Sequence, residues 1–165
     1  MSKTLYSGQY FSIMQSDNGD DYILSGNETI VVPIDASGQV YLIKEPSSAF
    51  GEQCLLLPGG SVDDGETPSV AANRELQEEI GYAANTLSYL GEIWPFSKYL
   101  TVRTFVFAGR DLVPSSMTGD EDHEIEKHLY AGDDLQRLIQ SGQINDARVI
   151  AALFMSGVVA PPSPM

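Results

Sequence analysis

The segment that most constrains the fold covers residues 60–82, where turn residues lead into one well-marked helix. Thr67 is suited to cap a helix N-terminus, Pro68 fits the first helical position, and Gly81 is typical of the residue that ends a helix. Apolar side chains recur every four residues in between, at Ala72, Leu76 and Ile80. The spacing therefore predicts a helix that starts at Pro68, ends before Gly81 and packs one face on a core.

The polar side of this helix carries glutamates at a spacing that brings them together. Positions i, i+3 and i+4 share one helical face, so Glu75, Glu78 and Glu79 are expected to converge. Arg74 lies one turn before Glu78 and can brace the cluster. Like charges on a helix cost about 0.2–0.5 kcal/mol per pair, a penalty that a divalent cation reverses. Carboxylate oxygens select Mg²⁺ or Mn²⁺ over zinc. An ordinary charged helix face is the alternative for the glutamates alone, but the flanking arginine and glycines favour a metal site.

The full pattern resembles the Nudix box, the signature of a family of hydrolases. That signature reads Gly, five residues, Glu, seven residues, Arg-Glu, a bulky apolar residue, any residue, Glu-Glu, any residue, Gly and a bulky apolar residue. Every fixed position between Gly60 and Tyr82 matches, although Tyr82 stands where an aliphatic residue is usual. The resemblance implies an α+β fold, a Nudix-type α/β/α sandwich with a mixed β-sheet, formed by residues 1–165 as one domain. It also implies Mg²⁺-dependent hydrolysis of the pyrophosphate bond in a nucleoside diphosphate derivative.

The same resemblance assigns roles to the box residues. It implies that Glu75 and Glu79 are the principal metal ligands, and that Glu78 assists through metal or water. The Gly59 carbonyl would complete the metal site, and Glu66 would support the loop–helix geometry through hydrogen bonds. Mn²⁺ could replace Mg²⁺.

Outside the box, residues 71–81, 119–121 and 145–148 are similar to the ADP-ribose pyrophosphatase branch, especially its ADP-compounds hydrolase members. The implied substrate is ADP-ribose or a related ADP compound, with AMP and a phosphorylated product released. Two positions depart from that branch. Pro95 lies closer to the box than the branch's marker proline, and His123 stands where a second glutamate is common.

The acidic stretch of residues 119–126 is expected to supply the general base. The box carboxylates are needed as metal ligands, and a ligated carboxylate is a poor proton acceptor. Glu121 falls on one of the two acidic positions that the resembled branch uses, so it is predicted to be the base. His123 falls on the other and is the alternative, with an ordinary pKa of about 6.5. A solvated acidic loop without a catalytic role is the third interpretation.

Other activities stay open from the sequence. Residues 94–97 partly resemble the motif of NADH pyrophosphatases, whose zinc-ribbon cysteines are absent here, and nucleotide sugars are a further substrate class. Trp94 and Phe96 could stack on a base, or pack in the core or at its edge. A Nudix fold that senses a nucleotide without cutting it is the competing class, but Arg74 and the box glutamates are all present.

Charge and composition limit the partners. The formal net charge of −14 repels nucleic-acid phosphates, so non-specific nucleic-acid binding is not expected. Cys54 is the single cysteine, which excludes an internal disulfide and favours a reducing, cytoplasmic setting. The apolar tail of residues 149–160 is too short to span a bilayer, and the N-terminus lacks the apolar stretch of a signal peptide.

The rest of the chain alternates strand-like and helical patterns. Residues 1–28 hold short strands around a polar turn and are a candidate dimerisation element, because branch members are typically homodimers. Residues 29–34 and 39–44 predict a hairpin. Further strands are expected at residues 87–94 and 100–108, a loop at residues 120–127, and helices at residues 133–140 and 147–155.

Overall fold

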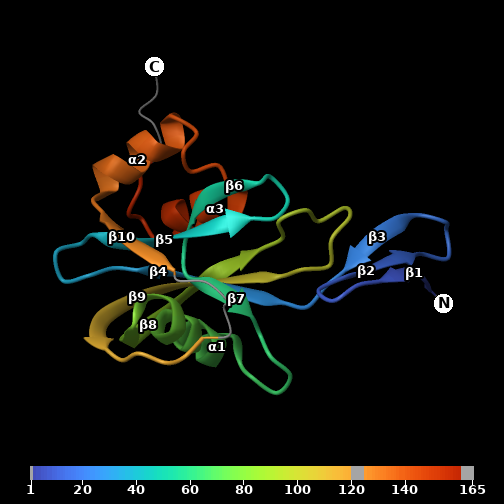
Figure 1. Ribbon diagram of the computed structural model, residues 1–165, viewed down its shortest axis with the longest axis horizontal. Coiled ribbons are helices and arrows are strands. Elements are labelled where there is room, and N and C mark those ends of the chain that lie inside the picture. Colours follow the sequence, from blue (N-terminus) through green and yellow to red (C-terminus); the bar gives the residue numbers. More distant parts are fainter. Residues whose placement is uncertain (1, 120–124, 161–165) are drawn as a thin grey trace.

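The computed structural model describes residues 2–119 and 125–160, which form three sheets (Figure 1). The largest sheet has the order β7-β4-β9-β8, with bounds Gly59–Ser61, Glu28–Pro33, Thr104–Pro114 and Tyr82–Ile93. A second sheet has the order β10-β5-β6, with bounds Glu126–Tyr130, Val40–Ser47 and Glu52–Leu56. A third joins β1 (Lys3–Ser7), β2 (Ser12–Gln15) and β3 (Asp21–Leu24). Strands β4 and β9 run parallel and the other pairs antiparallel, so the largest sheet is mixed, as expected.

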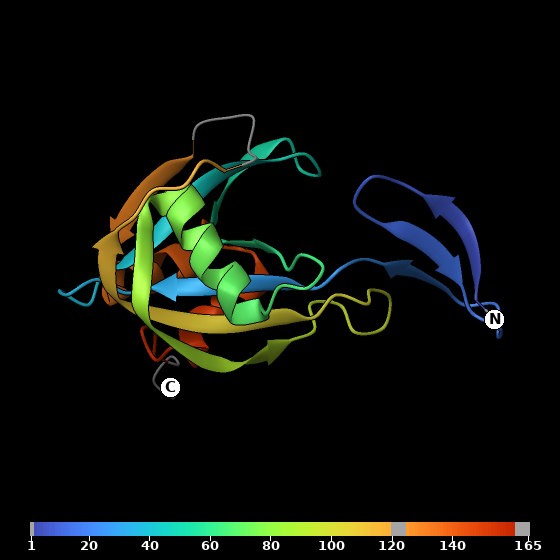
Figure 2. The same ribbon diagram turned by 90° about the horizontal axis from the view of Figure 1, so that it is seen from below.

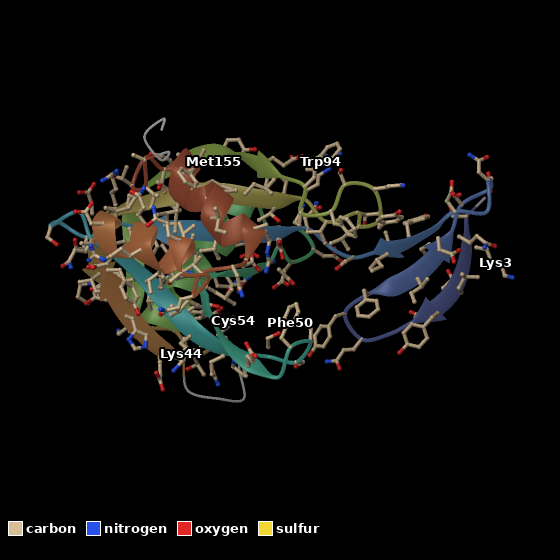
Figure 3. All side chains as sticks on the ribbon, turned by 90° about the horizontal axis from the view of Figure 1, so that it is seen from above. Lys3, Lys44, Phe50, Cys54, Trp94 and Met155 are labelled. Carbon is tan, nitrogen blue, oxygen red and sulfur yellow. The ribbon has the colours of Figure 1, made fainter. Side chains whose placement is uncertain are left out.

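Helices cover both faces of the two larger sheets. Helix α1 (Pro68–Glu75) and the π-helix η1 (Leu76–Ile80) lie across one face (Figure 2), and α2 (Gly132–Gln140) and α3 (Ala147–Met155) cover the other (Figure 3). Strand β4 contributes to the hydrophobic cores on both faces, because successive side chains point to opposite faces of the sheet. Val31 belongs to the same core as Leu76 of η1, and Val32 belongs to the same core as Leu153 of α3. The predicted α/β/α sandwich is confirmed.

The box helix begins where the sequence predicts. Thr67 caps α1, its Oγ1 accepting a hydrogen bond from the Val70 amide at 3.4 Å, and Pro68 opens the helix. Gly81 ends it in the left-handed region with φ of 75°. The predicted helix is therefore present up to Gly81, but its last turn is a π-turn, in which the Gly81 N–H donates to the Leu76 carbonyl. This wider π-turn keeps Leu76 and Ile80 in the core.

The predicted hairpin of residues 29–34 and 39–44 is wrong beyond its turn. The turn forms, because the Asp35 carboxylate accepts hydrogen bonds from the amides of Ser37 and Gln39. Only Ile34 and Val40 pair, and the strands then enter different sheets. Both strands are central, so each needs partners on its two edges: β4 pairs with β7 and β9, and β5 pairs with β6 and β10.

Other boundaries also shift. Strand β8 starts at Tyr82 rather than at Leu87, and β9 runs from Thr104 to Pro114 rather than over residues 100–108. Both strands differ from their predictions because they pair along their length as one antiparallel ribbon, with a bulge after Tyr89. Strand β10 includes residues expected in the acidic loop, since pairing with β5 orders this charged edge strand without an apolar pattern. The closing helices match their predictions to within one residue.

The N-terminal sheet stands apart from the two larger sheets (Figures 1 and 2). Its strands confirm the expected pieces in residues 1–28, and the polar stretch between β2 and β3 forms a turn with Gly19 at φ of 88°. Ile23 joins the sheet to the β8–β9 loop through backbone hydrogen bonds with Tyr99 and Thr101. Among the described residues, no helix is sufficiently long and apolar to cross a membrane.

Candidate active site

Strand β7 is the backbone surface on which the box carboxylates lie. A Cβ atom at Gly59 would come within 2.2 Å of the Thr29 carbonyl oxygen, and one at Gly60 would come within 2.4 Å of Glu75 Oε1. Position 59 therefore requires glycine, because the obstructing atoms are backbone atoms, whereas a side chain at position 60 would displace the Glu75 carboxylate. The first glycine allows β7 to pair closely with β4, and the second gives Glu75 room to reach the strand.

Two of the box glutamates are largely buried against this strand. Glu75 and Glu79 are each only 8% exposed. The Gly59 amide donates a hydrogen bond of 3.0 Å to Glu79 Oε2. Burying a carboxylate is costly without such partners, so these positions are built to hold negative charge near β7.

Arg74 links the helix to both the preceding loop and β7. Its Nη1 donates to Glu75 Oε1 at 2.8 Å and to Glu78 Oε2 at 2.9 Å. Its Nε and Nη2 each donate to Glu66 at 3.2 Å, and Nη2 also reaches the Ser61 carbonyl at 3.0 Å. The bracing contact expected between Arg74 and Glu78 is present, and so are the hydrogen bonds expected of Glu66. The box cluster consists of strand β7 and five side chains, those of Glu66, Arg74, Glu75, Glu78 and Glu79.

Hydrogen bonding within the box cluster shifts two pKa values in opposite directions. The Arg74 guanidinium holds the pKa of the Glu66 carboxyl below its ordinary value, against a smaller opposing effect of burial. Hydrogen bonding of Arg74 to Glu66, together with the charge of Glu75, raises the pKa of Arg74. Both groups therefore stay charged throughout the neutral range.

The three helix carboxylates converge less than the spacing predicts. Within residues 2–119 and 125–160, no three His, Cys, Asp or Glu side chains lie close enough together to hold a metal ion. Glu75 and Glu78 both accept hydrogen bonds from Arg74 Nη1, whereas Glu79 accepts one from the Gly59 amide. The three carboxylates therefore point to two different donors. The donor chemistry still fits a hard divalent cation, since carboxylate oxygens and a glycine-rich backbone lie side by side.

Two adjoining cavities lie near the box cluster, and the smaller one borders β7. Gly59, Gly60 and Arg148 line the smaller, of about 210 Å³. The larger, of about 860 Å³, lies between the β5–β6 hairpin and residues 142–148. Its volume is within the range of small-molecule sites. Both cavities share Glu45, Leu56 and Arg148, so a ligand that fills the larger one extends toward the box cluster.

A second arginine cluster, formed by Glu28, Asp146 and Arg148, stands at the junction of these cavities. Arg148 Nη1 donates to both Glu28 carboxylate oxygens at 2.9 Å. Its Nη2 donates to Asp146 Oδ2 at 2.8 Å, and its Nε donates to Asp146 Oδ1 at 3.2 Å. Hydrogen bonding to Asp146 raises the pKa of Arg148. Burial raises the pKa of Asp146, but hydrogen bonds from Arg148 outweigh it and leave the pKa below its ordinary value.

Sequence reasoning missed Glu28 entirely and noted Arg148 only within a similar segment. The available signals were weak: an acidic residue at the head of a buried strand, and an aspartate placed to cap an apolar helix. Asp146 does cap α3, accepting a hydrogen bond from the Arg148 amide at 2.8 Å.

Four further candidate residues from the sequence are Glu121, His123, Trp94 and Phe96. Glu121 and His123 fall outside the described residues. Core packing is excluded for Trp94 and Phe96, which are 56% and 58% exposed. Packing at the edge of the fold is present for Phe96, whose ring centroid lies 5.0 Å from that of Tyr99. The Arg103 guanidinium lies 5.5 Å from the Trp94 ring centroid. Trp94 and Phe50 lie at the end of the two larger sheets that faces the N-terminal sheet (Figure 3).

Comparisons with known proteins agree with this geometry. A family model described as NUDIX domain matches residues 25–153. The ADP compounds hydrolase NudE of Escherichia coli (strain K12) is 31% identical over 126 residues, which cover 76% of this chain and 67% of the relative. An ADP-ribose pyrophosphatase of Bacillus subtilis (strain 168) is 25% identical over 125 residues, covering 74% and 68%.

A solved structure extends the similarity to the fold. It is described as an ADP compounds hydrolase and superposes with a TM-score of 0.82 and 26% sequence identity, over 95% of this chain and 90% of that one. The range matched by the family model includes both arginine clusters and both cavities.

Proposed function

The chain belongs to the Nudix family of pyrophosphate-bond hydrolases, and on that premise we propose that it cleaves ADP-ribose or a related ADP compound. The observation that carries this proposal is the box cluster on β7, which borders the cavity of about 210 Å³ that adjoins a larger one of about 860 Å³. Similarity to an ADP compounds hydrolase and to an ADP-ribose pyrophosphatase over about three quarters of the chain supports the substrate class, since it extends well beyond the box.

In this proposal, Glu75, Glu78, Glu79 and the Gly59 carbonyl hold Mg²⁺, and Mn²⁺ can substitute. The cation supplies charge neutralisation for the diphosphate and lowers the pKa of water that it binds. Arg74 keeps Glu75 and Glu78 oriented toward β7 and stays protonated while it does so. Glu66 fixes the loop before the helix by holding two of the Arg74 nitrogens.

The chemical step is the attack of water on one phosphorus. A new P–O bond forms and the P–O bond of the bridging oxygen breaks, so the bridging oxygen leaves with the departing phosphate. Glu121 accepts the proton of the attacking water in this proposal. With ADP-ribose as substrate, the products are AMP and ribose 5-phosphate.

A hydrolysis screen tests the assignment. Purified protein is assayed with ADP-ribose, NADH, dinucleoside polyphosphates, nucleotide sugars and nucleoside triphosphates, each with Mg²⁺ and with Mn²⁺. We expect ADP-ribose or another ADP-linked compound to give the highest kcat/KM. A nucleoside triphosphate at the head of the ranking would refute the proposed substrate class. No turnover of any substrate would favour the nucleotide-sensing alternative.

We also propose a homodimer in the cytoplasm, with the N-terminal sheet as the dimerisation element. Tyr10 and Phe11, at the turn between β1 and β2, are 78% and 45% exposed, which is unusual for aromatic side chains that do not meet a partner. Sedimentation of the full chain and of a Tyr10→Ser/Phe11→Ser variant tests this. A monomer at micromolar concentration in the unaltered chain would contradict it.

A further inference from the structure

We propose that Glu28 and Arg148 are a positioning pair that holds β7, and with it the box cluster, in register for catalysis. This inference rests on the proposed function for its kinetic and Mg²⁺-binding readouts, but not for the hydrogen–deuterium exchange of β7. It concerns residues on the opposite side of β4 from the box helix, which neither the box pattern nor the comparisons assign.

The first step is the place of Glu28 in the sheet. It lies directly opposite Ser61 in the β4–β7 pairing, and the next two pairs are Thr29 with Gly60 and Ile30 with Gly59. Ser61 in turn accepts a hydrogen bond from Arg74 Nη2 at 3.0 Å. Glu28, which Arg148 holds, therefore pairs directly with a residue of β7 that contacts Arg74.

The second step is how firmly Glu28 is held. Its Oε1 accepts from the Thr104 hydroxyl at 2.5 Å, which ties it to β9, and both oxygens accept from Arg148 Nη1. The Glu28 side chain is 22% exposed and that of Arg148 is 33% exposed, so these bonds are partly shielded from water. Charge-assisted bonds in this setting are stronger than neutral ones and fix geometry.

The third step separates positioning from substrate binding. Arg148 lines both cavities, so it could contact an anionic ligand directly. However, each of its three guanidinium nitrogens already donates to a carboxylate of Glu28 or Asp146. One cation between two acidic side chains offers little net attraction to a phosphate. The arrangement instead fastens the start of α3 to the start of β4.

The two roles predict different kinetics. If the pair positions β7, then Glu28→Gln and Arg148→Met remove the same constraint. Each should lower kcat about 10-fold or more, the range typical of outer partners of metal ligands, with KM changed less than about twofold. The double variant should be no worse than either single one, since coupled residues are non-additive. If Arg148 binds substrate, Glu28→Gln should keep kcat, and Arg148→Met should raise KM.

Readouts that need no substrate complete the test. In hydrogen–deuterium exchange, the amides of β7 should exchange faster in both variants, and calorimetric titration with Mg²⁺ alone should show about 10-fold weaker binding. Arg137→Met is the matched control, because Arg137 forms an exposed pair with Asp134 on α2 and should leave both readouts unchanged.

The outcomes are distinct. Arg148→Met removes a partly buried cation and could unfold the chain, but Glu28→Gln is nearly isosteric and decides the question alone. Unchanged β7 exchange and unchanged Mg²⁺ affinity in Glu28→Gln would overturn the proposal, as would a selective rise of KM in Arg148→Met. If the unaltered chain hydrolyses no tested substrate while β7 exchange still rises in Glu28→Gln, the proposed function fails and the positioning role stands.

Discussion

The box cluster and the second arginine cluster use the same chemistry in different ways. In each, one guanidinium joins carboxylates from separate parts of the fold. Arg74 gathers partners from one continuous segment, with none more than 13 positions away, so helical spacing makes it visible in the sequence. Arg148 meets Glu28 across 120 positions, so only the tertiary structure brings the two together. The residues of the box cluster were therefore predictable from the sequence, whereas the pairing of Glu28 with Arg148 was not.

If the two clusters bind the metal and position the sheet, the proton acceptor must lie elsewhere, and its substitution should cause the largest loss of activity. The predicted base Glu121 belongs to neither, and loss of a general base typically costs about 10²–10⁴ in rate. We expect Glu121→Gln to reduce kcat by that amount at fixed Mg²⁺, while His123→Ala and Glu124→Gln stay near the unaltered rate. A large loss in His123→Ala alone, with a rate that falls below about pH 6.5, would transfer the role to the histidine.

Within the box cluster, activity should be separable from stability. Glu79→Gln removes a charge from the metal-binding set but leaves an oxygen that can accept the Gly59 amide. We expect kcat to fall about 10²–10³-fold, as for loss of one group that stabilises the transition state. Tm should hold or rise, because repulsion within the cluster decreases. Steady-state kinetics at saturating Mg²⁺ and thermal unfolding give both values, and near-normal turnover would refute the metal assignment.

The same division explains which parts of the fold were predictable. Thr67, Pro68 and Gly81 are local signals, so the limits of the box helix followed from sequence. The π-turn did not, because it depends on how Leu76 and Ile80 pack against the sheet. Strand β10 carries no apolar alternation and exists through its pairing with β5. The separation of β4 from β5 likewise depends on edge partners that lie far away in the chain.

The free energy of unfolding should decrease more when the second arginine cluster is altered than when the cap of the box helix is removed. Asp146 both caps α3 and holds Arg148, whereas Thr67 only caps α1. Loss of a cap typically costs about 1 kcal/mol. We therefore expect Asp146→Ala to lower the free energy of unfolding by more than Thr67→Ala does, measured by urea denaturation. Asp146→Asn keeps a good cap and should lie between Asp146→Ala and the unaltered chain. Equal losses in the two alanine variants would show that Arg148 adds nothing.

The smallest of the predicted effects is the loss of folding stability at acidic pH, to which both clusters contribute. The Glu66 and Asp146 carboxyls have pKa values below their ordinary 4.5 and 3.8 in the folded chain. A carboxyl of this kind binds fewer protons when folded than when unfolded. Its stabilising contribution is complete above the ordinary pKa and is lost as pH falls through the lower, folded value. The free energy of unfolding should therefore decrease as pH falls below about 4.5.

Glu66→Gln and Asp146→Asn should each flatten the profile of Tm against pH, whereas Asp64→Asn, at an exposed loop position, should leave it unchanged. If Tm falls with pH as steeply in Glu66→Gln as in the unaltered chain, Arg74 does not hold that carboxylate in solution. The same result in Asp146→Asn would exclude an electrostatic contribution from the second cluster.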